Sequence, residues 1–313
     1  MTVAFTFPGQ GSQVVGMGKA LADAEFEARA VFEAVDEALG EKLSQIIWEG
    51  PIDTLTLTEN AQPALMAVSL AAMRVLEARG VSLRDKAAYV AGHSLGEYSA
   101  LAAAGAFSVA DAARLLRARG RAMQAAVPVG SGAMAALLGM DVDAARDVAA
   151  EAADVAVCSV ANDNGGGQVV ISGNKAAVER AIAIAQQKGV KRAILLPVSA
   201  PFHCALMAPA AEAMQEALAA VTIKAPVVPL VANVLARPIS DPAEIRRRLV
   251  EQVTGMVRWR ESVAWLGGTG VGLFVEVGAG KVLSGLARRI VDGAEVLAVG
   301  APADINAAVA KLV

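Results

Sequence analysis

Gly92-His93-Ser94-Leu95-Gly96 joins an apolar run at residues 87–91 to a helical pattern at residues 95–104. A strand, a tight turn and a helix with a serine at the apex form the pattern of a nucleophile elbow. Strand and helix approach closely at such a turn, so side chains at positions 92 and 96 would clash. The turn exposes the Ser94 hydroxyl and places the first amides of the helix beside it. The stretch predicts a serine nucleophile, and the alternative is a serine in an ordinary loop.

The composition favours a large globular protein. The 313 residues are 55% hydrophobic, which is enough to bury a sizeable core. The formal net charge of −3 gives no basic bias, so we expect no nucleic acid partner. The apolar stretches at residues 65–73 and 99–107 are too short to span a bilayer, and residues 1–5 lack the basic start of a signal peptide. Cys158 and Cys204 are far apart in the sequence, which favours the reducing cytoplasm over a disulfide framework or a cysteine zinc site.

Strand and helix patterns alternate along most of the chain. Because such alternation produces a mostly parallel sheet covered on both faces, we expect an α/β fold of the α/β-hydrolase type. The strands are predicted at residues 3–7, 87–91, 226–233, 273–277 and 296–299. The helices are predicted at residues 25–39, 60–79, 95–104, 108–126, 205–220, 242–253, 281–291 and 305–312.

Residues 127–198 follow a different order. Their patterns predict strand 133–138, helix 142–153, strand 155–161, strand 168–172, helix 176–188 and strand 192–198. This β-α-β-β-α-β order is the ferredoxin-like split motif. We therefore expect residues 127–198 to form a small domain inserted into a large catalytic domain made of residues 1–126 and 199–313.

The helix predicted at residues 108–126 carries an arginine on its apolar face. At 100° per residue, Arg119 falls on the same side as Ala112, Leu115, Leu116 and Met123. Arg114, Arg117 and Arg121 fall opposite, where solvated charges belong. An unpaired buried guanidinium costs on the order of several kcal/mol, so Arg119 needs an anionic partner. The alternatives are a structural salt bridge and a side chain that reaches back to solvent.

A serine nucleophile needs a base, and the chain has 2 histidines. His93 adjoins Ser94 in the tight turn, so its ring should point away from the hydroxyl and serve packing. His203, in the loop at residues 199–203, remains as the base. The group that orients His203 stays open: a backbone carbonyl is one candidate, and the others are Asp154, Asp163 and Asp241.

Two glycine-rich segments fail as nucleotide-binding motifs. After Gly9, the dinucleotide pattern needs a glycine where Val14 stands. Before residues 278–281, the phosphate-loop pattern needs a glycine where Val275 stands. We expect no nucleotide cofactor, and the loop at residues 8–13 either brings backbone amides to the reacting centre or is a plain turn.

Six segments carry a family resemblance: residues 7–13, 92–97, 119, 200–203, 252–254 and 257–259. In this order along the chain, they resemble malonyl-CoA:acyl carrier protein transacylases of bacterial fatty acid synthesis, which are similar to the acyltransferase domains of polyketide synthases. The resemblance covers essentially the whole chain. Two positions depart from the pattern, with Met256 where proline is common and Cys204 where serine is common.

The resemblance implies a ping-pong reaction at Ser94. The serine would take the malonyl group from coenzyme A as an ester and pass it to the phosphopantetheine thiol of acyl carrier protein. His203 would be the base, held by the backbone carbonyl of Gln252. The amides of Gln10 and Leu95 would form the oxyanion hole.

The resemblance also implies a substrate pocket. Arg119 would bind the malonyl carboxylate, Phe202 would help to exclude branched acyl chains, and Asn162 would lie near the site. Malonyl-CoA and acyl carrier protein would be the partners of a cytoplasmic monomer that needs no metal or redox cofactor. The alternatives are a polyketide-type malonyl acyltransferase, a serine thioesterase or hydrolase, and a binding protein with an inactive elbow. A simple esterase has no use for a guanidinium in its acyl pocket, so Arg119 favours the transferase.

Overall fold

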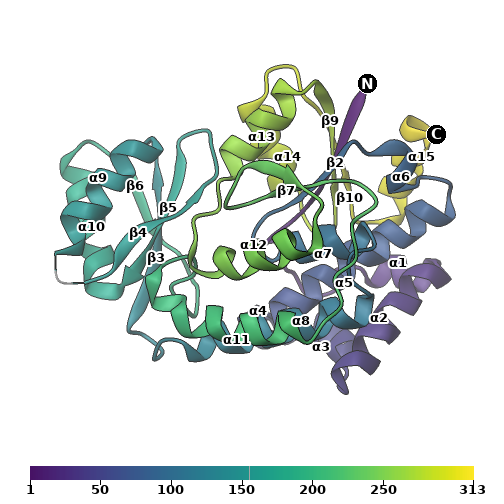
Figure 1. The fold of residues 1–313 in the computed structure, drawn as a ribbon, viewed down its shortest axis with the longest axis horizontal. Helices are drawn as coiled ribbons and strands as arrows, with labels where there is room; N and C mark the ends of the chain where they lie inside the picture. The colour runs from purple at the N-terminus through teal and green to yellow at the C-terminus, as the bar shows by residue number, and fades with distance from the viewer. Residues whose placement is uncertain (155) are drawn as a thin grey trace.

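The computed structural model describes residues 1–154 and 156–313 and contains two β-sheets (Figure 1). The larger sheet has six strands in the order β10-β9-β1-β2-β7-β8. The smaller has four strands in the order β4-β5-β3-β6. In Figure 1 the small sheet and its helices lie on the left, and the large sheet and both chain termini lie on the right.

The large sheet is mostly parallel. Its central strand β1, Thr2–Phe7, pairs in parallel with β2, Tyr89–Gly92, and with β9, Val271–Val277. Two further strands extend the parallel sheet, namely β10, Glu295–Val299, and β7, Leu230–Ala232. The short edge strand β8, Arg237–Ile239, is antiparallel to β7. The predicted mixed α/β architecture with a mostly parallel sheet is confirmed.

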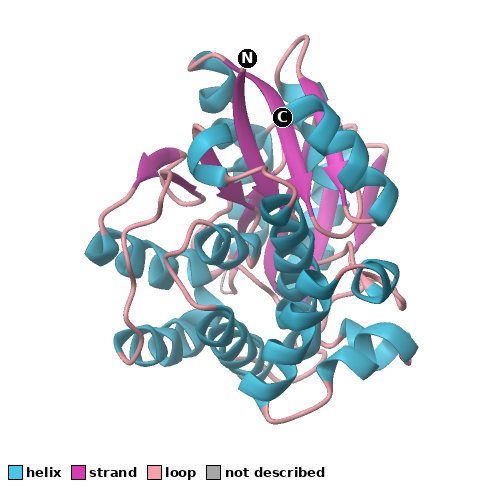
Figure 2. Ribbon diagram, turned by 90° about the vertical axis from the view of Figure 1, so that its right-hand side faces the viewer, coloured by secondary structure: helices cyan, strands magenta, loops and turns pink. Residues whose placement is uncertain are grey.

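Helices bury both faces of this sheet, as the alternation of side chains along β1 requires. Phe5 and Phe7 enter the largest core of the molecule, whereas Ala4 lies in a separate cluster with Trp259 on the other face. Figure 2 shows helices surrounding the strands. The core that contains Phe5 and Phe7 includes residues of α5, Thr58–Ala78, and α7, Gly96–Ala103. The cluster that contains Ala4 includes residues of α13, Trp259–Gly268, and α14, Val282–Ile290.

The remaining helices of this part complete the covering layers. The predicted helix at residues 205–220 is divided, because Pro209 lies in its first turn and has no amide hydrogen to continue the preceding turn. No helix among the described residues combines the length and the apolar character needed to cross a bilayer. The helices are α1, Lys19–Ala24; α2, Phe26–Leu39; α3, Leu43–Glu49; α4, Ile52–Thr56; α6, Leu83–Lys86; α8, Val109–Ala125; η1, Ala205–Met207; α11, Ala208–Ala219; α12, Pro242–Thr254; and α15, Pro302–Leu312.

In the small sheet all neighbouring strands are antiparallel. Side chains of β3 alternate between the cluster formed with α9 and α10 and the core of the larger part, so both faces are covered. Val155, where the second strand of this segment was predicted to begin, lies outside the described residues. The elements in chain order are β3, Gly132–Leu138; α9, Val142–Ala153; β4, Cys158–Asp163; β5, Gln168–Asn174; α10, Lys175–Gln187; and β6, Arg192–Leu195.

Backbone hydrogen bonds at Val257, which follows α12, tie this segment of the chain to the small sheet. The amide of Val257 donates to the carbonyl of Ala161 at 2.8 Å, and its carbonyl accepts from the amide of Asp163 at 3.0 Å. Val257 thus forms a parallel bridge with Asn162 of β4. This bridge fixes the chain just after α12 against the edge of the small sheet.

The predicted strand, turn and helix around Ser94 are present, and backbone packing accounts for the two glycines. A Cβ atom on Gly92 would lie 1.9 Å from the carbonyl of Gly96, and one on Gly96 would lie 2.2 Å from the carbonyl oxygen of Phe7. The contact between β1, β2 and α7 therefore leaves no room for side chains. Ser94, at the apex, has a φ of 53°, in the left-handed region that residues other than glycine seldom adopt.

This packing predicts that Gly92→Ala lowers the free energy of unfolding by at least about 3 kcal/mol, because the methyl group would collide with backbone that cannot move aside. Gly285→Ala is the matched control. A Cβ atom at this position in α14 meets nothing within 4 Å. The control should be neutral or stabilising by about 0.5–1 kcal/mol. Urea denaturation of both variants measures the difference, and equal stabilities would refute the packing argument.

Candidate active site

A pocket of about 550 Å³ lies at the carboxyl ends of β1 and β2. This is the edge at which parallel α/β sheets bind ligands. Met134 of the small sheet also lines the pocket, so both parts of the fold contribute to it. Gln252 was predicted for the site but does not line the pocket; it is fully buried behind it. The other predicted residues line it: Gln10, Ser94, Leu95, Arg119, Asn162, Phe202 and His203.

Ser94 and His203 meet in this pocket. The distance between Ser94 Oγ and His203 Nε2 is 2.8 Å. On the other side of the ring, Nδ1 lies 2.9 Å from the carbonyl oxygen of Gln252 and 3.1 Å from that of Gly255. Because carbonyl oxygens only accept, Nδ1 carries the hydrogen and Nε2 is free to accept the proton of the serine.

Backbone carbonyls therefore orient the base, which answers the question that the sequence left open. Within the described residues no aspartate bonds to His203. Asp163 pairs with Arg260 at 2.7 Å, and Asp241 caps α12 by accepting from the amide of Glu244. His203 has a φ of 58°, so both members of the pair occupy the strained left-handed region.

The surroundings of His203 keep its imidazole neutral. Burial is the main cause that lowers the pKa of His203 to about 3, and the positive charge of Arg119 acts in the same direction. The hydrogen bonds to the carbonyls of Gln252 and Gly255 act against this shift. The ring is thus unprotonated, and able to accept a proton, across the neutral and mildly acidic pH range.

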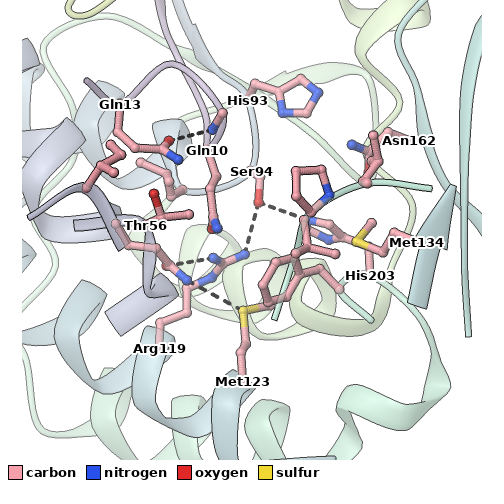
Figure 3. A pocket seen from close by; sticks show the side chains of 18 residues that line it. Gln10, Gln13, Thr56, His93, Ser94, Arg119, Met123, Met134, Asn162 and His203 are labelled. Carbon is pink, nitrogen blue, oxygen red and sulfur yellow. Dashed lines mark hydrogen bonds between the residues drawn. The ribbon is translucent and has the colours of Figure 1, made fainter. Parts of the chain in front are cut away.

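The ring of His93 points away from the Ser94 hydroxyl, as the geometry of adjacent residues predicted (Figure 3). His93 Nε2 lies 2.8 Å from the side-chain oxygen of Asn164, and the ring packs 5.5 Å from that of Trp259. The pKa of His93 is lowered by burial. These contacts join the elbow to the turn that follows β4.

Arg119 is buried beside the nucleophile, with 1% of its surface exposed. Its guanidinium donates to the side-chain oxygens of Gln62 at 2.8 Å and Gln252 at 2.8 Å. It also donates to Ser94 Oγ at 3.2 Å (Figure 3). All of these acceptors are neutral. Among the described residues no carboxylate lies within salt-bridge distance of Arg119. The alternatives of a structural salt bridge and of a side chain reaching solvent therefore do not apply, and the positive charge faces the pocket.

The prediction that Arg117 is solvated was wrong. Arg117 is 6% exposed and donates to the backbone carbonyl of Glu59 at 2.7 Å. It also bonds to the side chain of Asn60 and pairs with Glu41. The start of α5 and the residues before α3 cover this side of α8. A helical period shows which side faces the nearest core, but not what else packs on the helix.

The backbone amides of Gln10 and Leu95 have no hydrogen-bond partners among the described residues. Both residues line the pocket. The side chain of Gln10 is held by the Thr58 hydroxyl at 2.9 Å, and Leu95 immediately precedes α7. Amides at a helix start carry partial positive charge, so this pair can stabilise an oxyanion.

Sequence reasoning missed a buried polar network behind the elbow. The side chain of Asn233 accepts from the Ser94 amide at 2.8 Å and donates to the Gly92 carbonyl at 2.7 Å. Glu97, 1% exposed, accepts from the Asn233 amide at 2.6 Å and from the Gln252 side chain. Burial raises the pKa of Glu97 to about 8, although these hydrogen bonds and the charge of Arg119 lower it. The acidic Glu97, which follows the elbow directly and lies in a largely apolar helix, was the sequence signal that could have indicated this network.

Comparison with known proteins places this chain in the acyltransferase class. The family model described as "Acyl transferase domain" matches residues 4–300. Malonyl CoA-acyl carrier protein transacylase of Bacillus subtilis (strain 168) is 46% identical over 99% of this chain and 97% of the relative.

Solved structures of malonyltransferases are also similar to this chain. An acyl-carrier-protein-S-malonyltransferase from Bartonella henselae is 60% identical, with a TM-score of 0.98 over 100% of this chain and 99% of the other. A malonyl-transacylase in complex with a type II polyketide synthase acyl-carrier protein is 40% identical, with a TM-score of 0.96 over 99% of this chain and 100% of the other. The chain belongs to the acyl transferase family, and within it to the malonyl CoA-acyl carrier protein transacylases.

The low pKa of His203 predicts an unusual pH profile for Ser94. An ordinary histidine base, with a pKa of about 6.5, would lose reactivity as the pH falls below that value. The pKa of His203 is about 3, so its ring stays unprotonated at mildly acidic pH. The rate at which a fluorophosphonate labels Ser94 should therefore stay flat from a pH of about 8 to a pH of about 5. Circular dichroism at each pH controls for unfolding. A half-maximal rate near pH of about 6.5 would contradict the prediction.

Proposed function

We propose that the protein moves a malonyl group from coenzyme A to the phosphopantetheine thiol of acyl carrier protein, for fatty acid biosynthesis, through an ester on Ser94. One observation carries the acyl specificity. The Arg119 guanidinium is buried 3.2 Å from the nucleophilic oxygen and has only neutral hydrogen-bond acceptors. A site that holds a guanidinium beside its nucleophile, with no carboxylate bonded to it, favours an acyl group that ends in a carboxylate.

In the first half-reaction His203 Nε2 takes the Ser94 proton while Oγ attacks the thioester carbonyl carbon. The carbonyl oxygen becomes an oxyanion between the amides of Gln10 and Leu95. When it collapses, the carbon–sulfur bond breaks and the proton on His203 passes to the coenzyme A sulfur. The malonyl ester on Ser94 and free coenzyme A are the products.

The second half-reaction reverses these roles with a new thiol. His203 takes the proton of the phosphopantetheine thiol as its sulfur attacks the ester, and the same two amides stabilise the oxyanion. The ester bond then breaks, and Ser94 recovers its hydrogen from His203. Only protons and the acyl group move, so coenzyme A enters as a substrate and the proposed reaction uses no resident cofactor.

Three side chains define the acyl pocket in this proposal. Arg119 binds the malonyl carboxylate in a two-bond fork, which a planar guanidinium provides. Phe202 is 8% exposed beside the base, and we assign it the exclusion of branched acyl chains. The side-chain oxygen of Asn162 is buried without a partner among the described residues, so it can accept a hydrogen bond from the substrate.

We infer that residues 127–198 form an inserted ferredoxin-like domain and that residues 1–126 and 199–313 form an α/β-hydrolase-like domain. The sheet order β4-β5-β3-β6 and the packing of α9 and α10 in one cluster on that sheet support the first assignment. The nucleophile elbow after a strand of a mostly parallel sheet supports the second. The proposed enzyme acts as a cytoplasmic monomer.

A second candidate is the same transfer to the carrier protein of a polyketide synthase. The malonyl-transacylase solved with a type II polyketide carrier protein resembles this chain over almost its full length. The acyl chemistry is identical in both candidates, so only the acceptor differs. Transfer rates to the two kinds of carrier protein distinguish them.

The central test is intact mass spectrometry after mixing the protein with malonyl-CoA. We expect a single added malonyl mass that disappears when acyl carrier protein bearing phosphopantetheine is supplied. Ser94→Ala should remain folded and show no added mass, because the ester has no oxygen on which to form. A full mass shift in Ser94→Ala would overturn the assignment of the nucleophile.

The role of Arg119 predicts a change in acyl preference. In Arg119→Ala the malonyl carboxylate enters a dry pocket without a partner, so kcat/KM for malonyl-CoA should fall by roughly 2–5 kcal/mol of transition-state binding. Arg119→Lys should also be impaired because lysine cannot form the fork. The ratio of kcat/KM for acetyl-CoA, which lacks the carboxylate, to kcat/KM for malonyl-CoA should rise. An equal loss with both substrates would mean that Arg119 is only structural.

A further inference from the structure

Glu97 lies directly behind the site, and no step of the proposed reaction uses it. It is the second residue of α7, is 1% exposed, and accepts hydrogen bonds through both carboxyl oxygens. One oxygen accepts from the backbone amide of Asn233 at 2.6 Å and the other from the side-chain amide of Gln252. Both contacts are N–H donors, so they require an acceptor on the carboxyl group.

Gln252 connects this carboxylate to the guanidinium of Arg119. Its amide nitrogen donates to Glu97 and, at 2.9 Å, to the carbonyl of Ser94. Its amide oxygen accepts from Arg119 Nη2 at 2.8 Å. If the amide were turned over, its NH₂ would face the guanidinium, its oxygen would face the Ser94 carbonyl, and the Glu97 oxygen would lose its N–H donor. Glu97 thus helps to select the orientation in which an oxygen faces Arg119.

We propose that Glu97 is a positioning residue for acid recognition: by holding the Gln252 side-chain amide in one orientation, it fixes the Arg119 guanidinium where a substrate carboxylate can bind. This inference rests on the proposed function, because it concerns how the same enzyme selects a dicarboxylic acyl group. Glu97 does not touch the substrate or the reacting atoms. It acts through Gln252, whose side chain meets Arg119 while its main chain meets His203.

Gln252 contacts His203 through its main chain and Arg119 through its side chain, so the two contacts can be disturbed separately. The Gln252 carbonyl that orients His203 belongs to the backbone of α12 and is held by the helix. The Gln252 amide that meets Arg119 is a side chain and depends on its neighbours. Loss of the Glu97 carboxylate should therefore disturb acyl selection more than it disturbs the Ser94–His203 pair.

The test substitutes Glu97→Gln, which keeps the size of the side chain but adds an NH₂ group. Whichever way the new amide turns, it places an NH₂ against either the Asn233 amide or the Gln252 amide. Three quantities are measured on the full-length protein: kcat/KM for malonyl-CoA, kcat/KM for acetyl-CoA, and the rate at which a fluorophosphonate labels Ser94. The labelling rate reports the serine and its base without an acyl carboxylate.

Glu276→Gln is the matched control for the loss of a buried carboxylate. Glu276 is fully buried on β9 and accepts from the amides of Leu283 at 3.1 Å and Ser284 at 2.7 Å. It does not line the pocket. Its substitution should lower Tm but leave the ratio of kcat/KM for malonyl-CoA to that for acetyl-CoA within about twofold of the wild type.

We expect Glu97→Gln to lower the malonyl-to-acetyl ratio at least about tenfold, with the labelling rate within about threefold of the wild type. The proposal is overturned if the ratio is retained, if it falls equally in Glu276→Gln, or if both acyl rates and labelling fall together. Wild-type protein that takes no malonyl group would refute the proposed function itself. Active wild-type protein with an unchanged ratio in the variant refutes only the role of Glu97.

Gln252→Met provides the second variant if Glu97→Gln does not fold. It removes the amide that links Glu97 to Arg119 but retains the main-chain carbonyl that orients His203. The same fall of at least about tenfold in the malonyl-to-acetyl ratio is expected. Retention of the malonyl-to-acetyl ratio in this variant would overturn the proposal as well.

Discussion

The close approach of β2 and α7 at Gly92 and Gly96 is the constraint on which the site depends. With no room for a side chain at either position, the chain turns sharply and holds Ser94 in the left-handed region at the mouth of the pocket. His203 and Arg119 then reach the same serine oxygen from different elements. The fold thus fixes the position of Ser94, and the polar side chains of His203 and Arg119 surround its hydroxyl.

In the proposed reaction, Gln252 contacts both the base and the guanidinium that binds the acyl carboxylate. Its main chain orients the base, and its side chain accepts from the guanidinium without cancelling the positive charge. The same charge contributes to keeping His203 unprotonated, after burial. A carboxylate bonded directly to Arg119 would have removed both effects. Surrounding the guanidinium with neutral amides therefore keeps the site attractive to an anion and keeps its base ready to accept a proton.

Sequence reasoning succeeded where local rules decide the structure. The elbow follows from steric limits within five residues, and the inward direction of Arg119 follows from the period of one helix. The error at Arg117 arose because α5 and Glu41 cover α8 from segments that no helical period describes. Asn233 and the side chain of Gln62 carried no spacing signal, since their partners lie far away in the sequence. Glu97 did carry a signal, but its partners depend on tertiary packing.

The bridge between Val257 and Asn162 has a consequence for how this chain tolerates change. It is made by backbone groups, so the bridge itself does not depend on which side chain stands at residue 256. Inserting or deleting one residue there would instead shift the pairing, which turns side chains to the opposite face of a strand, and would displace the carbonyls that hold His203. The length of the segment is thus constrained in addition to the packing of Gly255 and Val257, whereas Met256 is accommodated by packing against the small-sheet core.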